Sequence, residues 1–365
     1  MELGLVGLPN VGKSTLFNAL TNAGAESANY PFCTIEPNIG IVDVPDERLE
    51  VLGKMYETDK ITPASLKFVD IAGLVKGASK GEGLGNQFLA SIRECDAIVH
   101  VVRCFEDDDI IHVDGTVDPI RDIANINTEL MLSDLESLEK QRPKFEKQAR
   151  SGDVDAYTNL KIIDVLIDTL NNGRTLRSLD YTDEQRSFVK SLFLITDKPV
   201  IYACNIAEKD LSGDYENLPF VKMVKYQAEL EKAEVLVISA KVEQELTELE
   251  PEDREMFLAD LGLKESGLSR IIKLGYKLLG QISYLTAGKK EVRAWTIKVG
   301  TKAPEAAGKI HSDFQKAFVK AEIVDYDDLV KYGSVANAKA EGKVRIEGKD
   351  YIVKDGDVIN FRVNA

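Results

Sequence analysis

The sequence has few cysteines and few histidines, and it has no long hydrophobic run. Its apolar stretches are well short of the roughly 20 residues that a membrane-spanning helix needs, which excludes a membrane-spanning protein. The 4 cysteines lie far apart and form no Cys-x-x-Cys pair, which argues against a disulfide framework and a zinc site. The chain opens on strand-like residues 3–6 and not on a basic segment followed by an apolar one, so we expect a cytoplasmic protein.

What is present is the composition of an ordinary folded protein. Hydrophobic residues make up 44% and charged residues 29% of the chain, which excludes global disorder. The length of 365 residues predicts two to three domains at about 150 residues each. A net charge of -15 would repel nucleic acid if it were evenly spread, but residues 281–365 hold 15 Lys and Arg against 12 Asp and Glu. That excess of +3 permits a mildly basic tail module and is also small enough to be chance.

Strand-like runs alternate with helical patterns over about residues 1–125, and this alternation is typical of a mostly parallel, doubly wound α/β sheet. The expected strands are 3–6, 39–42, 66–70 and 97–102, with expected helices at 14–22 and 86–95. Two further strands are expected at 199–204 and 235–239. We therefore predict one α/β domain made of residues 1–125 and 197–280.

The segment between these two parts, residues 126–196, is predicted to be a helical insertion. Its apolar residues recur at helical spacing, and a break near residues 151–153 suggests two long helices packed as an antiparallel hairpin. Residues 281–365 are predicted to form a small α+β module with strands at 292–299, 343–347, 351–353 and 358–363. One helix is expected to start at Pro304, with Ala307, Ile310, Phe314 and Phe318 on one face.

A phosphate-binding loop is the firmest functional prediction. Residues 7–14 read Gly-Leu-Pro-Asn-Val-Gly-Lys-Ser and stand between an expected strand and an expected helix. In such a Gly-x4-Gly-Lys-Ser loop the amide groups face phosphate oxygens, the lysine reaches the outer phosphates and the serine hydroxyl binds Mg²⁺. The predicted nucleotide contacts here are Asn10, Val11, Gly12, Lys13, Ser14 and Thr15.

An Asp-x-x-Gly motif follows at 70–73, where the expected strand 66–70 ends. Asp70 is predicted to hold the metal, through water, and Gly73 to offer its N–H to the terminal phosphate. A glycine-rich run over residues 77–85 then suggests a segment that phosphate contacts order, although it also fits a merely flexible loop.

These two motifs, together with the segments 29–38 and 348–357, resemble the YchF/Ola1 subfamily of Obg-related P-loop NTPases. The resemblance rests on the segments 7–15, 29–38, 70–78 and 348–357, and it covers essentially the whole chain. It implies a G domain, a helical coiled-coil insertion and a C-terminal TGS domain of β-grasp form. It also implies Mg²⁺ as cofactor with Thr34 as a further metal ligand, ATP preferred over GTP, and a cytoplasmic, mainly monomeric protein that binds an RNA-containing surface of the ribosome.

The base-binding loops are expected at 205–208 and 239–241, because each follows a strand of the α/β domain. A guanine site normally reads Asn-Lys-x-Asp, whereas Ile206 and Glu208 stand here at the lysine and aspartate positions. The aspartate that best distinguishes guanine from adenine is therefore missing. Adenine is predicted to bind through Asn205, Ile206, Glu208, Ser239 and Ala240. That Glu208 still reads guanine stays open as the alternative.

The catalytic group is less evident. Leu74 occupies the place where many switch GTPases carry a water-orienting glutamine, and it has no polar side-chain atom. Of the 3 histidines, His100 is expected in the core and His311 lies in the tail module. His112 follows an acidic loop and is proposed to swing over the terminal phosphate, with Lys13 and Gly73 as the other catalytic groups. A simply solvated His112 is the alternative.

Three classes of function fit these motifs. A slow ATPase acting as a switch on the translation machinery is preferred. A non-hydrolysing nucleotide-dependent scaffold differs from it only in phosphate release. A P-loop kinase is the weakest, because it explains neither the base loops nor the tail module.

Overall fold

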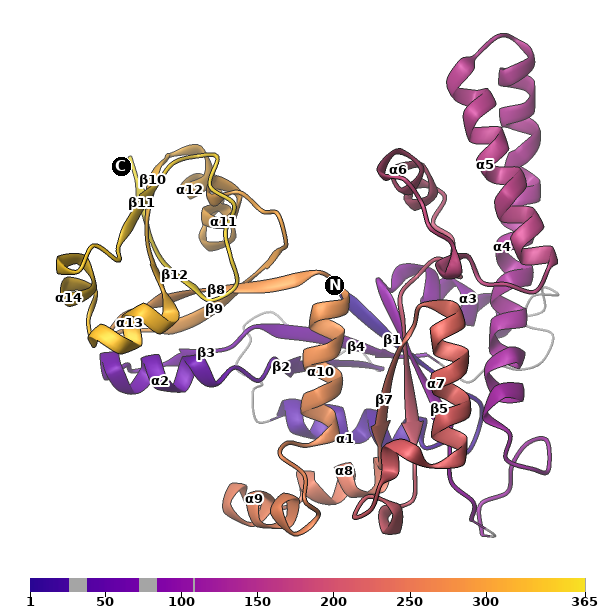
Figure 1. Ribbon diagram of the computed structural model, residues 1–365, viewed down its shortest axis with the longest axis horizontal. Helices are drawn as coiled ribbons and strands as arrows, with labels where there is room; N and C mark the ends of the chain where they lie inside the picture. Colours follow the sequence, from indigo (N-terminus) through magenta and orange to yellow (C-terminus); the bar gives the residue numbers. More distant parts are fainter. Residues whose placement is uncertain (26–37, 72–83, 108, 365) are drawn as a thin grey trace. The chain divides into compact units, whose positions relative to one another are not determined.

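The computed structural model describes residues 1–25, 38–71, 84–107 and 109–364 (Figure 1). Its contacts divide the chain into two compact units. The first consists of residues 1–40 and 67–271, and the second of residues 41–66 and 272–365. The second unit thus combines the C-terminal part of the chain with a segment from the N-terminal part, a grouping that the sequence analysis did not anticipate.

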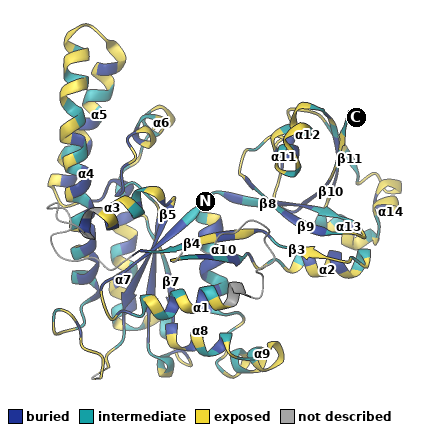
Figure 2. Ribbon diagram, turned by 180° about the vertical axis from the view of Figure 1, so that it is seen from behind, coloured by how far each residue is buried: buried dark blue, intermediate teal, exposed yellow. Residues whose placement is uncertain are grey.

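A six-stranded sheet with the order β2-β4-β1-β5-β6-β7 is the framework of the first unit. Its strands are β1 (Glu2–Val6), β2 (Ile39–Asp43), β4 (Ser65–Asp70), β5 (Ala97–Arg103), β6 (Val200–Asn205) and β7 (Glu234–Ile238). The last residues of β2 and the first of β4 are grouped with the second unit. β1 runs parallel to β4 and β5, and β6 runs parallel to β5 and β7. Every residue of β5 and β6 is buried, which explains their continuous apolar runs (Figure 2). The doubly wound α/β prediction is confirmed.

Helices pack against this sheet in neighbouring pairs. α1 (Lys13–Ala25) lies beside α8 (Ala240–Thr247), and α4 (Pro119–Arg150) lies beside α7 (Pro219–Glu231). The unit also contains α3 (Leu84–Glu94), α9 (Pro251–Asp260) and the first residues of α10 (Gly267–Leu278). No helix among the described residues combines the length and the apolar character needed to cross a membrane.

The helical insertion is a hairpin of α4 and α5 (Val154–Asn171), joined at the predicted break over residues 151–153 (Figure 1). It is followed by the short helices η2 (Leu176–Ser178) and α6 (Asp183–Ser191). Leu138, Ile163 and Leu166 are among the buried residues that join these helices. α4 begins at Pro119, before the predicted start of the insertion at residue 126, because Asp118 caps it by accepting from the amides of Ile120 and Arg121.

The second unit is built on a mixed sheet with the order β11-β10-β12-β8-β9-β3. Its strands are β3 (Ile61–Thr62), β8 (Gln281–Ala287), β9 (Val292–Lys298), β10 (Phe318–Asp325), β11 (Arg345–Glu347) and β12 (Asp357–Val363). The helices are α2 (Glu47–Tyr56), α11 (Ala303–Ile310), α12 (Ser312–Lys316), α13 (Tyr326–Tyr332) and α14 (Val335–Ala340). This is the predicted α+β tail module, with β8 and β10 as strands that the sequence pattern did not reveal.

Two local predictions for the tail were wrong. The expected continuous helix from Pro304 to Phe318 stops at His311, whose extended backbone ends α11 and whose side chain caps α12. Phe318 is therefore the first residue of β10 and packs in the core of the unit. The expected strand at 351–353 is reduced to a single bridge between Ile352 and Lys302.

Within the second unit, backbone hydrogen bonds and an ion pair join residues 41–66 to the C-terminal part of the chain. β3 pairs with β9, and the Val292 amide donates to the Lys60 carbonyl at 2.9 Å. The Arg48 guanidinium contacts the carboxylates of Asp46 and Asp355, each at 2.8 Å. The Arg48–Asp355 pair joins residues that lie 307 positions apart, and only the folded chain brings them together.

Candidate nucleotide-binding site

The loop between β1 and α1 has the backbone shape of a phosphate-binding loop. Asn10 and Gly12 adopt left-handed conformations, with φ of 63° and 93°. α1 then begins at Lys13, and the amide of Leu16 donates to the carbonyl of Gly12 at 3.0 Å. A loop that wraps in this way and ends in a helix N-terminus is suited to hold negatively charged phosphate oxygens.

Asn205, the last residue of β6, connects this loop to the predicted base-binding loops. Its side-chain amide donates to the Val11 carbonyl at 2.8 Å, and its side-chain oxygen accepts from the Ala240 amide at 2.9 Å. A Cβ at Gly12 would collide with the Asn205 side chain, so glycine is required there by space as well as by φ. In this conformation Asn205 is 4% exposed, and it organises the site from within.

Lys13 and Asp70 form an ion pair at the expected position of the outer phosphates and the metal. Asp70 is the last residue of β4 and is paired with Leu5 of β1, which brings it beside the phosphate loop. Ser14 is exposed in the first turn of α1. Hydroxyl and carboxylate oxygens are ligands that Mg²⁺ prefers, so Ser14 and Asp70 fit the predicted metal.

The predicted base-binding loops depart from a guanine site in two ways. Ile206 is 2% exposed and packs into the core, so no cationic side chain is available at this position. Glu208 pairs with Lys241, with an O–N distance of 2.8 Å, and this hydrogen bond raises the pKa of Lys241. Ser239 and Ala240 are buried where β7 meets α8. The Glu208 carboxylate is therefore already compensated by a neighbouring charge.

The loop that carries His112 lies against the phosphate loop. The side-chain amide of Asn10 donates to the carbonyl of Ile111 at 3.1 Å. His112 itself is neither solvated nor extended over the phosphates, because it is 6% exposed and bonded to Asp122 at 2.9 Å. The conformation thus differs from both alternatives that the sequence left open.

The other two histidines lie as expected. His100 is 3% exposed on β5 and packs against the Tyr202 ring, and its burial lowers its pKa to about 3. His311 lies in the second unit, where it caps α12.

Several residues named from the sequence lie outside the described residues. These are Thr34, Gly73, Leu74 and most of the glycine-rich run over 77–85. Their predicted roles as metal ligand, phosphate contact and missing water-orienting group remain predictions.

Two residues beside the site were not predicted from the sequence. Arg103, at the end of β5, is 1% exposed, and its guanidinium donates to the carbonyls of Phe105, Asp107 and Ile110. Asp122, in the first turns of α4, is 1% exposed and holds His112. A charged residue ending an otherwise apolar strand was the available signal for Arg103, whereas nothing local marked Asp122.

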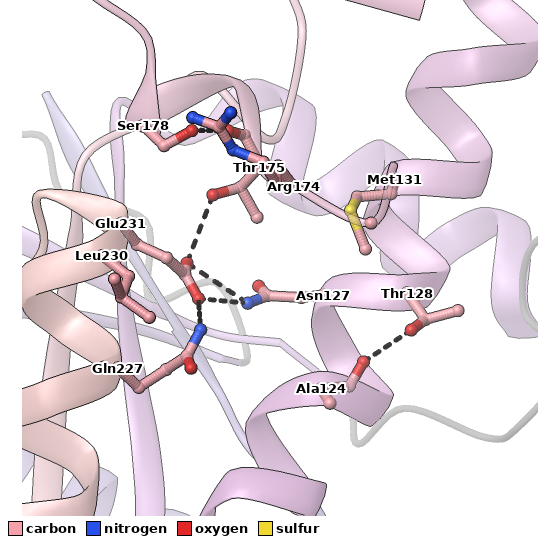
Figure 3. Close-up of a pocket in the computed structure, with 11 residues that line it drawn as sticks. Ala124, Asn127, Thr128, Met131, Arg174, Thr175, Ser178, Gln227, Leu230 and Glu231 are labelled. Atoms are coloured by element: carbon pink, nitrogen blue, oxygen red, sulfur yellow. Dashed lines mark hydrogen bonds between the residues drawn. The ribbon is translucent and has the colours of Figure 1, made fainter. Parts of the chain in front are cut away.

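A separate polar cluster lies where the base of the helical hairpin meets α7, beside a cavity of about 490 Å³ (Figure 3). Its centre is the carboxylate of Glu231, which pairs with Arg177 at 3.0 Å. Asn127, Thr175, Tyr202 and Gln227 also donate to it. A buried carboxylate with so many donors is fully satisfied, so we assign it to fixing the hairpin on the sheet.

The parallel sheet, the Gly-x4-Gly-Lys-Ser loop leading into α1 and the Lys13–Asp70 pair define a P-loop nucleotide-binding protein. Family models support this class: one described as 50S ribosome-binding GTPase matches residues 2–134. The model of the YchF-GTPase C-terminal domain, described as a protein of unknown function, matches residues 281–364.

Relatives extend the match to the whole chain. It is 55% identical to the ribosome-binding ATPase YchF of Bacillus subtilis (strain 168) over 365 residues, covering 100% of both. It is 52% identical to that of Escherichia coli O157:H7, covering 100% of this chain and 99% of the other. The solved structure of the Schizosaccharomyces pombe YchF GTPase matches with a TM-score of 0.89 at 39% identity, covering 99% and 97% of the two chains. The chain therefore belongs to the YchF family of P-loop proteins, which confirms the resemblance seen in the sequence.

Proposed function

We propose that this protein is a Mg²⁺-dependent ATPase that prefers ATP to GTP and acts as a slow conformational switch on the ribosome. The observation that carries the proposal is the P-loop assembly, in which Asn205 joins the phosphate loop to the base loops and Lys13 lies beside Asp70. The names of the relatives, which are ribosome-binding ATPases, support the reaction and the partner. Association with ribosomes would place it in the cytoplasm, and we propose that it acts mainly as a monomer.

The phosphate groups would be held by the amide groups of residues 10–15 and by Lys13. Ser14 and Asp70 would hold Mg²⁺ together with Thr34, and the bound ion would neutralise charge on the triphosphate. Because Lys13 and Asp70 contact each other in this structure, triphosphate binding requires Lys13 to turn from the carboxylate to the phosphates. Gly73 would add its N–H to the terminal phosphate.

The preference for adenine follows from the Glu208–Lys241 pair and from Ile206. Guanine presents two N–H donors that need a free carboxylate, and here they would have to displace the Lys241 ammonium. Adenine needs no carboxylate, since an amine donor and a ring acceptor can be matched by backbone groups of the loops around Ile206 and Ala240. Binding adenine should therefore cost less free energy at this site than binding guanine.

Hydrolysis needs a water that is oriented for attack on the terminal phosphorus. The water oxygen forms the new P–O bond as the bond to the β-phosphate oxygen breaks, giving ADP, phosphate and a proton. Leu74 offers no polar atom for this task, and we assign it to His112, whose loop is already hydrogen-bonded to Asn10. Slow intrinsic turnover is expected, because His112 is buried in this structure.

The direct test is phosphate release under multiple-turnover conditions, with ATP or GTP, with Mg²⁺ or a chelator, and without any acceptor. We expect ADP and phosphate from ATP in the presence of Mg²⁺, with slower turnover of GTP. Binding of ATP without phosphate release would favour the scaffold instead. A requirement for an acceptor would favour the kinase.

Ribosome association is tested by co-sedimentation of the full-length chain in ADP and in a non-hydrolysable ATP analogue. We expect the bound fraction to depend on the nucleotide, and Lys13→Ala to remove that dependence. Full-length protein is needed because removing residues 281–365 would deprive residues 41–66 of their sheet partners. Equal sedimentation in both nucleotides would contradict a switch.

A further inference from the structure

Both ring nitrogens of His112 are occupied by other groups of the protein. Nε2 lies 2.9 Å from Oδ2 of Asp122, and Nδ1 lies 3.0 Å from the backbone nitrogen of Asp114. A backbone N–H can only donate, so Nδ1 accepts. The ring proton is therefore on Nε2, where it is donated to Asp122. An imidazole bonded in this way has no nitrogen left to orient a water molecule.

The contact with Asp122 is enclosed but sparsely supported. The side chains of His112 and Asp122 are 3% and 2% exposed. Among the described residues, the other carboxylate oxygen of Asp122 accepts no hydrogen bond, and Arg121 approaches it only to 3.6 Å. Burial raises the pKa of Asp122, while His112 acts in the opposite direction. Among the described residues, the Asp122 carboxylate is therefore the one side-chain group that is hydrogen-bonded to the imidazole, beside the backbone amide of Asp114.

The backbone around His112 is held more firmly than its side chain. Buried Arg103 donates to three carbonyls of residues 105–110, and Asn10 donates to the carbonyl of Ile111. The loop is thereby held beside the phosphate loop whichever way the imidazole points. Asn10 is also the place where a change in the phosphate loop can reach His112.

We propose that Asp122 is a positioning residue that withholds His112 from the nucleotide, so that hydrolysis requires the His112–Asp122 hydrogen bond to break. The inference rests on the proposed role of His112 in hydrolysis. It assigns the slow intrinsic turnover to a definite contact, and it makes release of the imidazole the step on which an activating partner can act. Asp122 itself would contact neither the nucleotide nor the attacking water.

The test is Asp122→Asn in the full-length protein, assayed by single-turnover hydrolysis of ATP. Asparagine keeps the volume and an oxygen acceptor but loses the charge, and hydrogen bonds to neutral groups are weaker than those to charged ones. We expect the rate of the chemical step to rise by about five- to tenfold, with ATP affinity changed less than twofold. A fall in rate, or no change, would overturn the proposal.

Two companion variants separate this mechanism from a structural effect. Asp109→Asn removes an acidic charge from an exposed position three residues before His112 and keeps the backbone N–H that bonds to Asp107, so its rate should stay within about twofold of the parent. Asp122→Asn in a His112→Ala background should have no effect, because the residue acts through His112. Acceleration by Asp109→Asn, or by Asp122→Asn without His112, would count against the assignment.

A readout besides activity keeps this inference distinct from the catalytic role of His112. Nitrogen-15 shifts of the ring report the tautomer, and with 3 histidines the signal is assigned by its loss in His112→Ala. We expect the Nε2–H form in the parent and a mixture of forms in Asp122→Asn. An unaltered spectrum refutes the contact. The spectrum could instead change in Asp122→Asn while His112→Ala hydrolyses ATP at the parental rate. That result refutes the catalytic role of His112, and with it the withholding role of Asp122.

Discussion

Asn205 donates a hydrogen bond to the carbonyl of Val11 at 2.8 Å, although 194 residues separate the two in the chain. The same side chain accepts from the Ala240 amide, so one buried asparagine fixes the phosphate loop relative to the predicted base-binding loops. A nucleotide that contacts both loops depends on that spacing, because binding to a preorganised site avoids the cost of ordering it.

Replacing Asn205 by alanine should therefore weaken ATP binding by about tenfold and lower the free energy of unfolding by about 2–4 kcal/mol, since two buried polar groups lose their partner. Equilibrium titration with a fluorescent ATP analogue and urea unfolding measure these two effects. Asn217→Ala is a matched control on an exposed turn, where the side chain bonds to Asp214 and to no other described residue. Equal effects of the two substitutions would contradict the organising role of Asn205.

Lys13→Ala and Ser14→Ala should each abolish Mg²⁺-nucleotide binding or turnover and leave the fold intact. Each removes a contact to phosphate or metal and no core contact, because Ser14 is exposed and Lys13 pairs only with Asp70 among the described residues. Circular dichroism checks the fold, and phosphate release checks the activity. Undiminished turnover in both variants would show that the P-loop assignment is wrong.

Lys241→Met should improve GTP binding more than ATP binding, because it frees the Glu208 carboxylate for the donors of guanine. The two side chains are 69% and 42% exposed, so their pair is weak, and the gain in GTP affinity should be at most about fivefold. Lys209→Met, in the same loop but outside the pair, controls for loss of charge. Unchanged relative affinities for the two nucleotides would argue that Glu208 does not face the base.

His112→Ala should slow single-turnover hydrolysis by about 10²–10⁴-fold with little change in ATP affinity, because positioned acid–base groups contribute on this scale. Leu74→Gln need not restore fast turnover, since a glutamine must also be held at the correct angle. A rate for His112→Ala within twofold of the parent would contradict the catalytic role of His112. The catalytic group would then have to come from Gly73, the segment 76–85 or the ribosome.

His100 should make the folded protein sensitive to acid. Burial lowers its pKa from 6.5 to about 3, so below pH 6.5 the unfolded chain binds a proton that the folded chain excludes. Its contribution to stability is therefore present at neutral pH and is lost as the pH falls. Relative to His100→Leu, the parent should lose about 2 kcal/mol more between pH 7.5 and pH 5 in urea unfolding. His311→Leu, at an exposed position, should show a much smaller difference, and an equal one would contradict the prediction.

For most helices and strands of the first unit, the sequence predicted the first and last residues to within one to three positions. This was possible because each strand is a short apolar run between polar turns. The helices and strands of the C-terminal module were harder to predict. The helical spacing of Ala307, Ile310 and Phe314 continues to Phe318, but the chain reverses at His311, and Phe318 packs in the sheet core instead. Periodicity cannot distinguish these outcomes, since both bury the same apolar residues. The partnership of residues 41–66 with residues 272–365 was equally hidden, because it depends on pairs such as Arg48 and Asp355 that are far apart in the chain.

The same division applies to the site. The sequence alone determined the phosphate loop, because the turn needs glycine at a left-handed position and a lysine directly after it, and these requirements are local. It also determined that Ile206 and Glu208 replace a guanine-reading pair. Only the tertiary structure decided that Glu208 meets Lys241, that Asn205 joins two loops and that His112 turns to Asp122. Side-chain partners of this kind are set by which strand ends lie side by side and by how a loop returns to its helix, and no local pattern encodes that geometry.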